Sequence, residues 1–372
     1  MEHYIQAASI RWYNACAYYA VTLSEGLAAA GYRVTFAGDP GTPAMKRAVE
    51  EGIETLSVES RSSNKILNQI AVIREYRRYV KENDVTLVNV HNGTDHFLWA
   101  MALRGTGIPL IRTSGNQIPP NVHPLSRFLL KKGTSGIIAS CGTIRGFYAD
   151  GFGIDADTIP VINGGINIGH YSAEYDRVML RKKFGLPENG FVFGLVGRFS
   201  HDKGHKHFFR AAGIIAQEFP DVRFHVAGWD AQLKLKDIHA MAKGSGVFDR
   251  TVFTGREKDS REIAQSLDAG VIASVRSETV CRIAMEYMAM GIPVISSDTN
   301  VIPEVVRNNE TGLVVPAGNP EAMASAMKQL MISKELAETF SRSGRKVAEK
   351  EYSLESFAAQ TIEAYGSILG NG

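Results

Sequence analysis

Short apolar runs alternate with segments of helical periodicity along the whole chain, and this alternation restricts the fold more than any other feature. Runs such as YRVTFAG at residues 32–38 and AGVIAS at residues 269–274 are typical of buried strands. Each run lies near a segment in which apolar residues recur at helical spacing. Strands that alternate with helices form parallel sheets. The sequence therefore predicts an α/β protein built on parallel sheets.

The chain is long enough for more than one domain, because 372 residues suffice for two domains of ordinary size. Residues 160–176 contain Asn163, Gly164 and Gly165 and show little periodicity, which indicates a hinge. We expect an N-terminal domain over residues 1–165, a second domain over residues 166–351 and a last amphipathic helix within residues 352–372.

Composition narrows the class of protein. Hydrophobic residues make up 44% and charged residues 22% of the chain, as in soluble globular proteins, and the net charge of +2 gives no field that would favour nucleic acid. The cysteines Cys16, Cys141 and Cys281 have no paired spacing, which argues against a disulfide scaffold or a zinc site. The start of the chain does not resemble a signal peptide, and no apolar run reaches the roughly 18 residues of a membrane span. We expect a cytoplasmic protein.

Two glutamates flank the start of a predicted helix in SETVCRIAMEYMAMGIPVISSD, residues 277–298. Glu278 follows the strand AGVIAS, and Glu286 lies about two turns into a helix that ends near Met290, before Pro293. Ligands bind open α/β sheets at the carboxyl ends of the strands. Glu278 is placed to accept hydrogen bonds from sugar hydroxyls, and Glu286 from the vicinal diol of a ribose.

A second loop carries two cations. In FVFGLVGRFSHDKGHKH, residues 191–207, an apolar strand leads to Gly197, and Arg198 and Lys203 precede a helix that starts near His205. Glycine allows the backbone to pass close to a ligand, and two fixed cations suit a diphosphate. The free N–H groups at the helix start near Val280–Ile283 also attract phosphate.

These segments resemble the family 4 glycosyltransferases. The resemblance is strong in the second half of the chain and weak in the first half, and it rests on both loops described above and on four further motifs. The further motifs are FHVAGWD at 224–230, VFTGREKD at 252–259, IPEVVRNNETGLVVPAGNPEAMASAM at 302–327 and IPVINGGIN at 159–167.

The resemblance implies the GT-B fold, in which two Rossmann-like parallel-sheet domains face a central cleft and a C-terminal helix crosses back to the first domain. It also implies transfer of a sugar from a nucleotide diphosphate sugar to an acceptor hydroxyl with retention of anomeric configuration, in surface polysaccharide, lipopolysaccharide or glycolipid synthesis. The first domain is expected to bind the acceptor, a hydroxyl compound, and lipid-linked compounds are among the candidate acceptors. The donor is a co-substrate, and neither a cofactor nor a metal is expected.

The resemblance assigns roles residue by residue. Arg198 and Lys203 bind the donor diphosphate, Glu278 holds the transferred sugar, and Glu286 holds the ribose. The remaining donor-binding positions are Gly197, the backbone around Gly255 and Arg256 that frames the base, and the helix start at Val280, Cys281, Arg282 and Ile283. Two of these depart from the family, which often has glycine where Cys281 stands and an aliphatic residue where Arg282 stands.

Other interpretations stay open. A nucleotide-sugar 2-epimerase uses a similar fold, and a non-catalytic nucleotide-sugar-binding relative retains the same loops. The pair Asp155 and Asp157 resembles a metal-binding motif, but it lies far in sequence from the donor loops. His201, His205 and His207 lack the supporting ligands of a metal site.

The acceptor side is the least defined. Within residues 61–81, six cations (Arg61, Lys65, Arg74, Arg77, Arg78 and Lys81) accompany a single acid, Glu75. This stretch is either a solvated helix face or a weak contact with an anionic membrane surface, to which Arg127, Lys131 and Lys132 add. His91, at the end of the strand VTLVNVH, is either a group that faces the cleft or a satisfied strand-end histidine.

Overall fold

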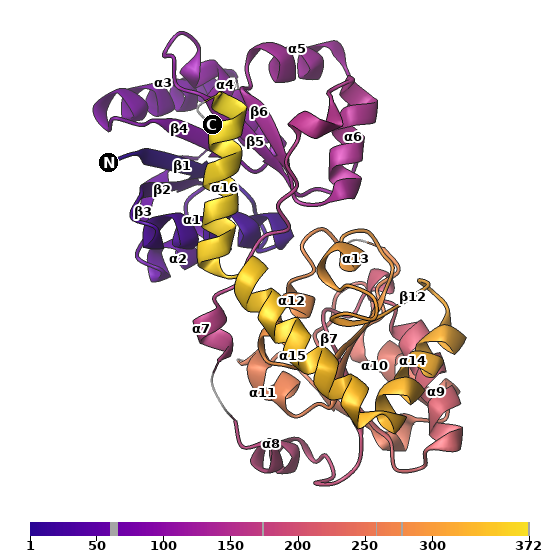
Figure 1. The fold of residues 1–372 in the computed structure, drawn as a ribbon. Coiled ribbons are helices and arrows are strands. Elements are labelled where there is room, and N and C mark those ends of the chain that lie inside the picture. The colour runs from indigo at the N-terminus through magenta and orange to yellow at the C-terminus, as the bar shows by residue number, and fades with distance from the viewer. Residues whose placement is uncertain (60–65, 173–174, 258, 277, 371–372) are drawn as a thin grey trace. The chain divides into compact units, whose positions relative to one another are not determined.

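The computed structural model describes residues 1–59, 66–172, 175–257, 259–276 and 278–370, and it divides into two compact units (Figure 1). The first unit comprises Met1–Ile166 and Ser353–Gly372, and the second comprises Asn167–Tyr352. A parallel β-bridge between Ile166 and Ser353 joins the two stretches of chain that make up the first unit.

The first unit is built on a six-stranded parallel sheet with the strand order β3-β2-β1-β4-β5-β6. Its strands are β1 His3–Ala7, β2 Arg33–Gly38, β3 Glu54–Ser57, β4 Leu87–Val90, β5 Leu110–Ser114 and β6 Gly136–Ala139. Its helices are α1 Ala15–Ala29, α2 Pro43–Glu50, α3 Ile66–Glu82, α4 Gly93–Leu103, α5 Pro124–Lys132, α6 Gly142–Phe152 and α16 Leu354–Leu369.

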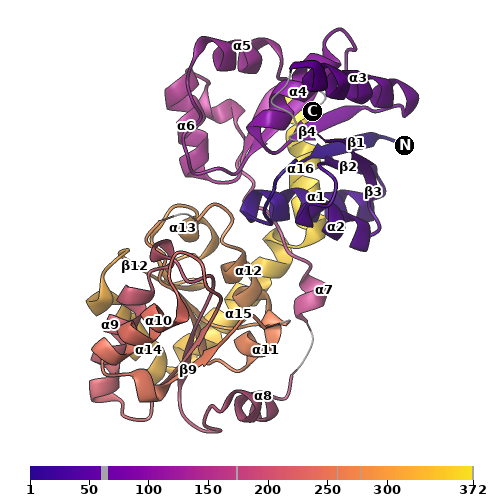
Figure 2. The same cartoon turned by 180° about the vertical axis from the view of Figure 1, so that it is seen from behind.

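The helices of the first unit cover the sheet because their apolar faces are buried against it. Helices α3 and α4 lie side by side (Figure 2), and Tyr76 stacks on Trp99 with 4.0 Å between the ring centroids. Helix α16 packs on α1 so closely that a Cβ atom on Gly26 would lie 2.7 Å from the carbonyl oxygen of Leu354. The side-chain amides of Gln6 and Asn89 donate to the hydroxyl of Tyr365. The predicted C-terminal helix is therefore confirmed as part of the first unit.

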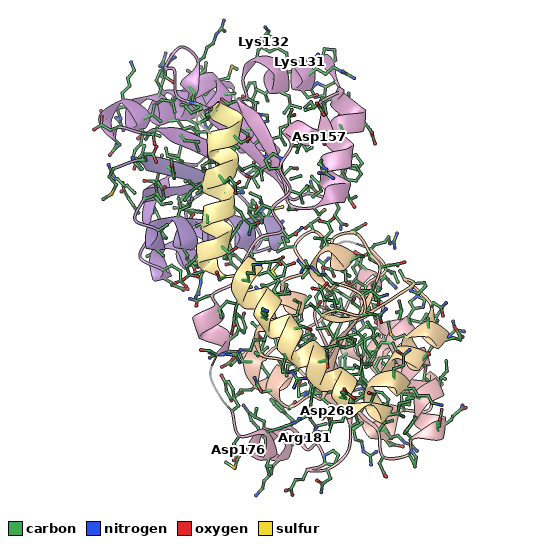
Figure 3. All side chains as sticks on the ribbon, viewed as in Figure 1. Lys131, Lys132, Asp157, Asp176, Arg181 and Asp268 are labelled. Atoms are coloured by element: carbon green, nitrogen blue, oxygen red, sulfur yellow. The ribbon has the colours of Figure 1, made fainter. Side chains whose placement is uncertain are left out.

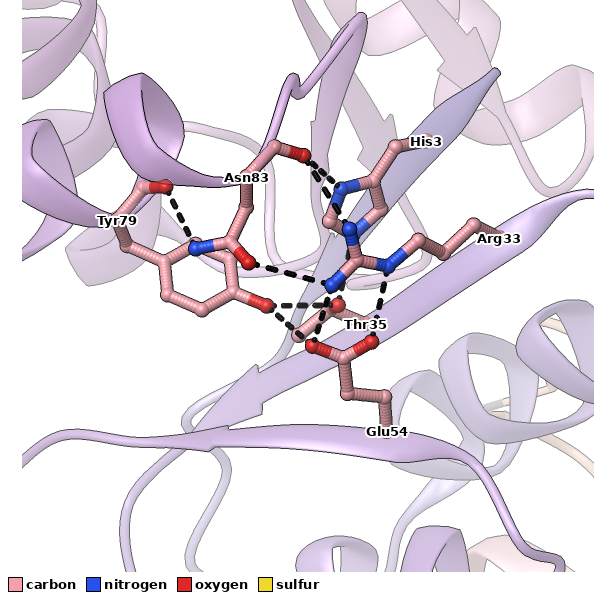
Figure 4. Close-up of polar contacts among 6 residues, drawn as sticks. All are labelled: His3, Arg33, Thr35, Glu54, Tyr79 and Asn83. Carbon is pink, nitrogen blue, oxygen red and sulfur yellow. Dashed lines mark hydrogen bonds and ion pairs between the residues drawn. The ribbon is translucent and has the colours of Figure 1, made fainter. Parts of the chain in front are cut away.

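A polar cluster closes the amino edge of this sheet (Figure 4). Arg33 at the start of β2 donates to Glu54 at the start of β3, with an Nε–Oε2 distance of 3.1 Å. His3 Nδ1 lies 2.7 Å from the carbonyl oxygen of Asn83, and the hydroxyl of Tyr79 donates to Glu54 at 2.7 Å. Because ligands bind at the opposite edge of parallel sheets, we interpret this cluster as structural.

The second unit is built on another six-stranded parallel sheet, with the strand order β12-β11-β10-β7-β8-β9. Its strands are β7 Val192–Val196, β8 Arg223–Ala227, β9 Thr251–Thr254, β10 Ala269–Ile272, β11 Val294–Ser297 and β12 Gly312–Val315. Its helices are α7 Ile168–Tyr171, α8 Arg177–Phe184, α9 His205–Glu218, α10 Leu235–Gly244, α11 Ser260–Gln265, α12 Arg282–Ala289, α13 Ile302–Val305, α14 Pro320–Ile332 and α15 Lys334–Glu351.

Buried aromatic and aliphatic side chains form the core of the second unit, among them Phe193 and Phe224 on adjacent strands. An ion pair at its border joins Arg181 in α8 to Asp268 before β10, with 2.5 Å between Nη2 and Oδ2 (Figure 3). Arg181 also donates to the carbonyl oxygen of Ser266, which fastens α8 to the sheet.

The strand order reverses once in each sheet, and this reversal positions the candidate sites. In the first unit, β1 and β4 are neighbours whose connections run in opposite directions, and β7 and β10 have the same relationship in the second unit. The loops after such a pair of strands diverge and leave room for a ligand at the carboxyl edge. The loop after β7 is the predicted cationic loop, and the loop after β10 carries Glu278.

Candidate active site

An ion pair joins the two loops at the point where the strand order of the second unit reverses. Lys203 Nζ, after β7, contacts Glu278 Oε1, after β10. The hydroxyl of Ser274 donates to the same carboxylate oxygen at 2.6 Å, and the Glu278 side chain is only 8% exposed. The structure thus brings together two predicted site residues that lie 75 positions apart in the chain.

Close backbone packing holds these loops against each other. Gly204 has a φ of +67°, and a Cβ atom there would lie 1.8 Å from the carbonyl oxygen of Ala273. Only glycine fits such a contact. The amide of Val275 donates to the carbonyl oxygen of Asp202 at 2.8 Å, which fixes the two loops relative to each other.

Arg198 lies in the same cationic loop but differs from Lys203 in its surroundings. Its side chain is exposed, and it makes no hydrogen bond or ion pair with any residue that the structure describes. Gly197, which precedes it, donates its amide to the carbonyl oxygen of Ala227 at 2.9 Å. The loop therefore presents one paired cation and one cation that is available to an anionic ligand.

Glu286 occupies a second buried position near these loops. It is 2% exposed, accepts a hydrogen bond from the hydroxyl of Tyr171 at 2.8 Å, and pairs with Arg282, whose Nε lies 2.8 Å from Oε1. Helix α12 begins at Arg282, so Glu286 lies about one turn into the helix. The prediction that Glu286 lies two turns into the helix was wrong, because Val280 and Cys281 belong to the preceding loop.

Cys281 explains the late start of this helix. It adopts the left-handed conformation, with φ +50° and ψ +47°, which favours glycine. Its side chain is 3% exposed, and burial raises the pKa of the Cys281 thiol, so the thiol stays protonated at neutral pH. Beside it, Val280 is buried and Ile283 is half-buried, so these two apolar side chains anchor the turn from which the helix starts.

The predicted base-binding segment follows β9. Gly255 and Arg256 are exposed, and the guanidinium of Arg256 lies over the ring of Trp229, 5.0 Å from its centroid. Trp229 is 43% exposed and follows β8. Among the described residues, no hydrogen bond or ion pair connects this stacked pair with Lys203 or Glu278.

Sequence reasoning missed two contributors to this edge of the sheet. Tyr171 lies 115 positions before Glu286, so no local pattern connects them. Trp229 stands in the quoted motif FHVAGWD, directly after a glycine at a strand end, and this placement of an aromatic residue is the signal that identifies it.

Two of the residues considered for metal binding, His205 and Asp155, take part in packing and in helix capping. His205 is buried beside Phe199, and burial lowers its pKa to about 4. Asp155 accepts a hydrogen bond from the amide of Asp157 at 3.1 Å and so caps a short 3₁₀ turn. Within the described part of the chain, no three His, Cys, Asp or Glu residues are grouped as a metal site requires.

The candidates in the first unit have mixed outcomes. His91 is 3% exposed, its Nε2 lies 2.9 Å from Gln6 Oε1, and burial lowers its pKa to about 3, which favours the interpretation as a satisfied strand-end histidine. Arg61 and Lys65 lie outside the described residues. In α3, Arg78 bonds to Glu75 and Arg77 bonds to the carbonyl oxygen of Arg104. Lys131 and Lys132 are exposed at the end of α5 (Figure 3).

A cavity of about 730 Å³ lies between α5, β6 and α16 of the first unit. Its wall includes the cations Arg127 and Lys131 and the carboxylates Asp157 and Glu363, together with apolar residues of β6 and α16. Opposite charges are therefore balanced along this wall.

Comparisons with known proteins agree with this architecture. Residues 17–170 match the family model described as Glycosyltransferase Family 4, and residues 176–347 match the model described as Glycosyl transferases group 1. The chain belongs to the family 4 glycosyltransferases, which are retaining enzymes, as the sequence resemblance predicted.

Individual relatives are distant. The chain is similar to a 2-deoxystreptamine glucosyltransferase from Streptomyces kanamyceticus, with 26% identity over 94% of this chain and 97% of that protein. It is also similar to a phosphatidyl-myo-inositol mannosyltransferase from Mycobacterium leprae, with 25% identity over 81% of this chain and 79% of that protein.

Two solved structures share the fold. A glycosyltransferase from Rickettsia africae has a TM-score of 0.88 and 18% identity, and the match covers 100% of this chain and 99% of that one. Anabaena Alr3699/HepE in complex with UDP has a TM-score of 0.85 and 18% identity, and the match covers 99% of this chain and 100% of that one. These likenesses confirm two α/β domains of the GT-B type.

Proposed function

We propose that the protein transfers a hexose from a nucleotide diphosphate sugar to an acceptor hydroxyl with retention, in glycolipid, lipopolysaccharide or surface polysaccharide synthesis. The observation that carries this proposal is the Lys203–Glu278 ion pair, together with the exposed Arg198 of the same loop, which has no partner among the described residues. The pair places a cation and a carboxylate next to each other, as a donor with a diphosphate and a sugar requires. The second unit is the donor-binding unit, and the first unit binds the acceptor.

Two ion pairs of the site, Lys203–Glu278 and Arg282–Glu286, are replaced by contacts with the donor when it binds. When the diphosphate binds, Lys203 and Arg198 contact its oxygens, and Glu278 becomes free to accept hydrogen bonds from hydroxyls of the transferred sugar. In the same way, a ribose diol displaces Arg282 from Glu286, while Tyr171 keeps the carboxylate in position. Arg282, which is exposed, then adds positive charge near the phosphates.

The reaction needs stabilisation of the departing diphosphate more than it needs a protein nucleophile. The bond between the anomeric carbon and the phosphate oxygen breaks while the bond to the acceptor oxygen forms. As the family resemblance implies, the donor phosphate receives the acceptor proton. Arg198 and Lys203 stabilise the negative charge that grows on the leaving group. Electrostatic stabilisation of this kind is usually the largest single contribution to catalysis. The buried, protonated Cys281 thiol takes no part as a nucleophile.

The acceptor is proposed to be a hydroxyl compound that includes a lipid anchor, used at the inner face of a membrane by a cytoplasmic enzyme. No helix in the described residues has the length and apolar character needed to cross a bilayer. Helix α5 instead exposes Leu125 and Phe128, which are 56% and 60% accessible, beside Lys131 and Lys132. No aspartate or glutamate occurs between Asp95 and Asp150. Such a surface favours a weak contact with anionic lipids.

The proposal is tested by thermal unfolding with a panel of nucleotide diphosphate sugars, followed by product analysis. UDP-glucose is the first donor to test because a structural neighbour was solved with UDP. We expect one donor to raise the melting temperature and to yield a glycosylated acceptor with retained configuration. A new sugar isomer formed from donor alone would identify a 2-epimerase, and binding without any product would identify a non-catalytic relative.

A further inference from the structure

The outer edge of β6 is paired along only part of its length. β6 is the last strand of the first sheet, and its one neighbour among the described strands is β5. At its carboxyl end, the amide of Ala139 donates to the carbonyl oxygen of Pro160 at 2.9 Å, and the amide of Ile162 donates to the carbonyl oxygen of Ala139 at 2.9 Å. Residues 160–162 therefore extend the sheet beside Ala139 in the parallel direction.

Ile137 has backbone groups that face the same edge without a partner. It lies two residues before Ala139, and the N–H and C=O groups of a strand face its two edges alternately. Before Pro160 the chain forms the 3₁₀ turn Ala156–Thr158 and not a strand, so the pairing ends there. Among the described residues, no hydrogen bond to these two groups of Ile137 is present. Ile137 is nevertheless only 4% exposed, and buried backbone groups are almost always paired.

This unpaired edge lines the cavity of about 730 Å³ described above, which we call the β6 groove. Helix α5 forms one wall of the groove and ends against α4, where a Cβ atom on Gly133 would lie 3.4 Å from the Cβ atom of Ala100. Helix α16 forms another wall and packs on α1. Helices α4 and α1 cover opposite faces of the sheet (Figures 1 and 2). The β6 groove therefore follows the sheet edge with a helix on each side, and its volume is that of a ligand site.

The lining of the β6 groove disfavours two classes of occupant. An acyl chain would cover the backbone groups of Ile137 without bonding to them, and burial of polar groups in that way is unfavourable. A small ion would meet cations and carboxylates in equal number along the wall. An extended peptide meets both conditions, because its own N–H and C=O groups complete the hydrogen bonds of an edge strand and its side chains carry either charge.

Charges on the two helical walls match a peptide that carries an acid and a base next to each other. Lys131 lines the β6 groove from α5, and Glu363 lines it from α16. Successive side chains of a strand point to opposite faces of a sheet. Adjacent residues of an added strand would therefore reach opposite walls, with the acidic residue toward Lys131 and the basic residue toward Glu363.

We propose that the β6 groove binds an extended segment of a partner protein as an added strand, and that this segment contains an acidic residue beside a basic one. The backbone of the segment bonds to Ile137 and so continues the pairing that residues 160–162 make with Ala139. The function of the groove is docking and not catalysis. This inference goes beyond the proposed function, because strand addition at β6 requires neither donor nor turnover.

Hydrogen exchange in the full-length protein tests whether the edge is open. Amide exchange is followed by NMR with isotope-labelled isoleucine. We expect the Ile137 amide to exchange about tenfold faster than the amide of Ile138, which faces β5 in the sheet. Equal protection of the two amides in the protein alone would show that the edge is already paired and would overturn the proposal.

Strand addition is tested by calorimetry with the capped hexapeptide Thr-Val-Glu-Lys-Val-Thr, which exceeds the four residues of β6. Two further peptides carry N-methyl groups on alternate residues, so that each lacks the N–H donors of one edge. We expect one of them to bind like the parent and the other to lose about tenfold in affinity, because only one edge of a peptide pairs with β6. Equal affinities of all three peptides, or no saturable binding by any of them, would reject strand addition.

Variants of the two walls locate the bound peptide. Lys131→Glu should weaken binding of the parent peptide but not of an uncharged peptide with threonine in place of Glu and Lys. Lys132→Glu, which changes the next exposed lysine outside the groove, is the matched control and should change neither affinity.

Ser367→Trp fills the groove from α16 and should abolish binding, whereas Ala359→Trp, at an exposed position of α16 outside the groove, should not. Undiminished binding to Ser367→Trp would place the peptide elsewhere and overturn the site. Melting temperatures confirm that each variant is folded, and both positions are exposed, so little loss of stability is expected. No donor or lipid is present, so failure of these tests leaves the donor site and the membrane contact of α5 unaffected.

Discussion

Lys203 and Glu278 form an ion pair between the loops after β7 and β10, two strands that are neighbours in the sheet but far apart in the chain. The pair lies where the strand order reverses, and the Ser274 hydroxyl supports it from the loop after β10. Both charges are largely buried before any donor arrives. In the proposed donor complex, Lys203 and Glu278 therefore exchange each other for the donor as a partner, and two fully hydrated charges need not lose their water.

The two cations of the donor loop should differ when each is removed. Arg198→Ala and Lys203→Ala should each weaken nucleoside diphosphate binding by roughly 1.5–3 kcal/mol and abolish most turnover, because each loses a charged hydrogen bond. Lys203→Ala should also lower the melting temperature, because it leaves the Glu278 carboxylate buried and unpaired. Calorimetry and thermal unfolding measure these effects, with the exposed Arg210→Ala as a control. Unchanged affinity in both variants would remove the diphosphate assignment.

The two glutamates should separate binding from turnover. Glu286→Gln should mainly weaken binding of the nucleoside part, because a ribose diol is present in both donor and product. Tyr171→Phe should have the same effect in smaller measure, since it removes one hydrogen bond to Glu286. Glu278→Gln should mainly lower turnover, because in the proposed site this carboxylate contacts the transferred sugar. Affinities for nucleoside diphosphate and initial rates decide the matter, and equal losses of affinity in both glutamine variants would contradict the division.

Catalysis should proceed without a divalent metal. In the proposed donor site, the protein cations Arg198 and Lys203 neutralise the diphosphate, a role that a metal would otherwise have. Turnover should therefore be the same in excess chelator as in added Mg²⁺ or Mn²⁺. Rates measured after exhaustive dialysis against chelator provide the check. Activity that disappears there and returns with either metal would show that this prediction is wrong.

Contact with membranes should depend on α5 more than on α3. Wild-type protein should sediment with anionic vesicles at low salt, and Leu125→Ser/Phe128→Ser should reduce sedimentation, because the exposed apolar groups of α5 lie beside cations. The matched control is Leu67→Ser/Ile70→Ser, which removes two exposed apolar side chains from α3 in the same way. Each cation near an anionic surface contributes about 1 kcal/mol of attraction, and this attraction decays within a Debye length of ~8 Å at physiological salt.

Three results would speak against that surface. Absence of sedimentation in the wild type removes the membrane contact altogether. Equal sedimentation of the α5 variant and the wild type assigns the contact elsewhere. Loss in an Arg74/Arg77/Arg78→Ser variant alone returns it to the basic stretch of α3 and leaves α5 as a solvated helix.

Acid should destabilise the first unit through His91. Burial lowers the His91 pKa to about 3 in the folded protein, whereas the unfolded chain binds this proton near pH 6.5. The unfolded state therefore holds more protons between these values, so the free energy of unfolding falls as the pH decreases from about 6.5 toward 3. His91→Gln should weaken this dependence on pH, as measured by denaturant unfolding at several pH values. A pH dependence unchanged from the wild type would show that His91 does not titrate in this way.

Much of the fold was predictable because the alternation of strand and helix periods is local. The loops that carry Lys203 and Glu278 were identified from their own sequences, and parallel pairing of β7 with β10 then brings them together. Glu286 was predicted two turns into the helix, whereas it lies one turn in, because Cys281 adopts a left-handed conformation that helical periodicity does not reveal. Such a conformation depends on the packing of the turn rather than on the spacing of apolar residues.

Features that depend on distant segments were not predictable from patterns. The hydrogen bond from Tyr171 to Glu286 joins two elements that have no shared motif. From the sequence, His91 is either a group that faces the cleft or a satisfied strand-end histidine, and only the structure shows the hydrogen bond to Gln6 that favours the second interpretation. The burial of Arg112 follows from the placement of β5 within the sheet, and RTSGN on its own resembles any polar strand end.

Because α16 belongs to the first unit, that unit receives its last helix only after the second unit has been synthesised. Every residue from Asn167 to Tyr352 is synthesised before the last segment that the first unit requires. The side-chain amides of Gln6 and Asn89 therefore gain their hydrogen-bond partner Tyr365 only after the whole second unit has been synthesised. A nascent chain that stalls after Tyr352 therefore contains every residue of the second unit, whereas its first unit still lacks helix α16.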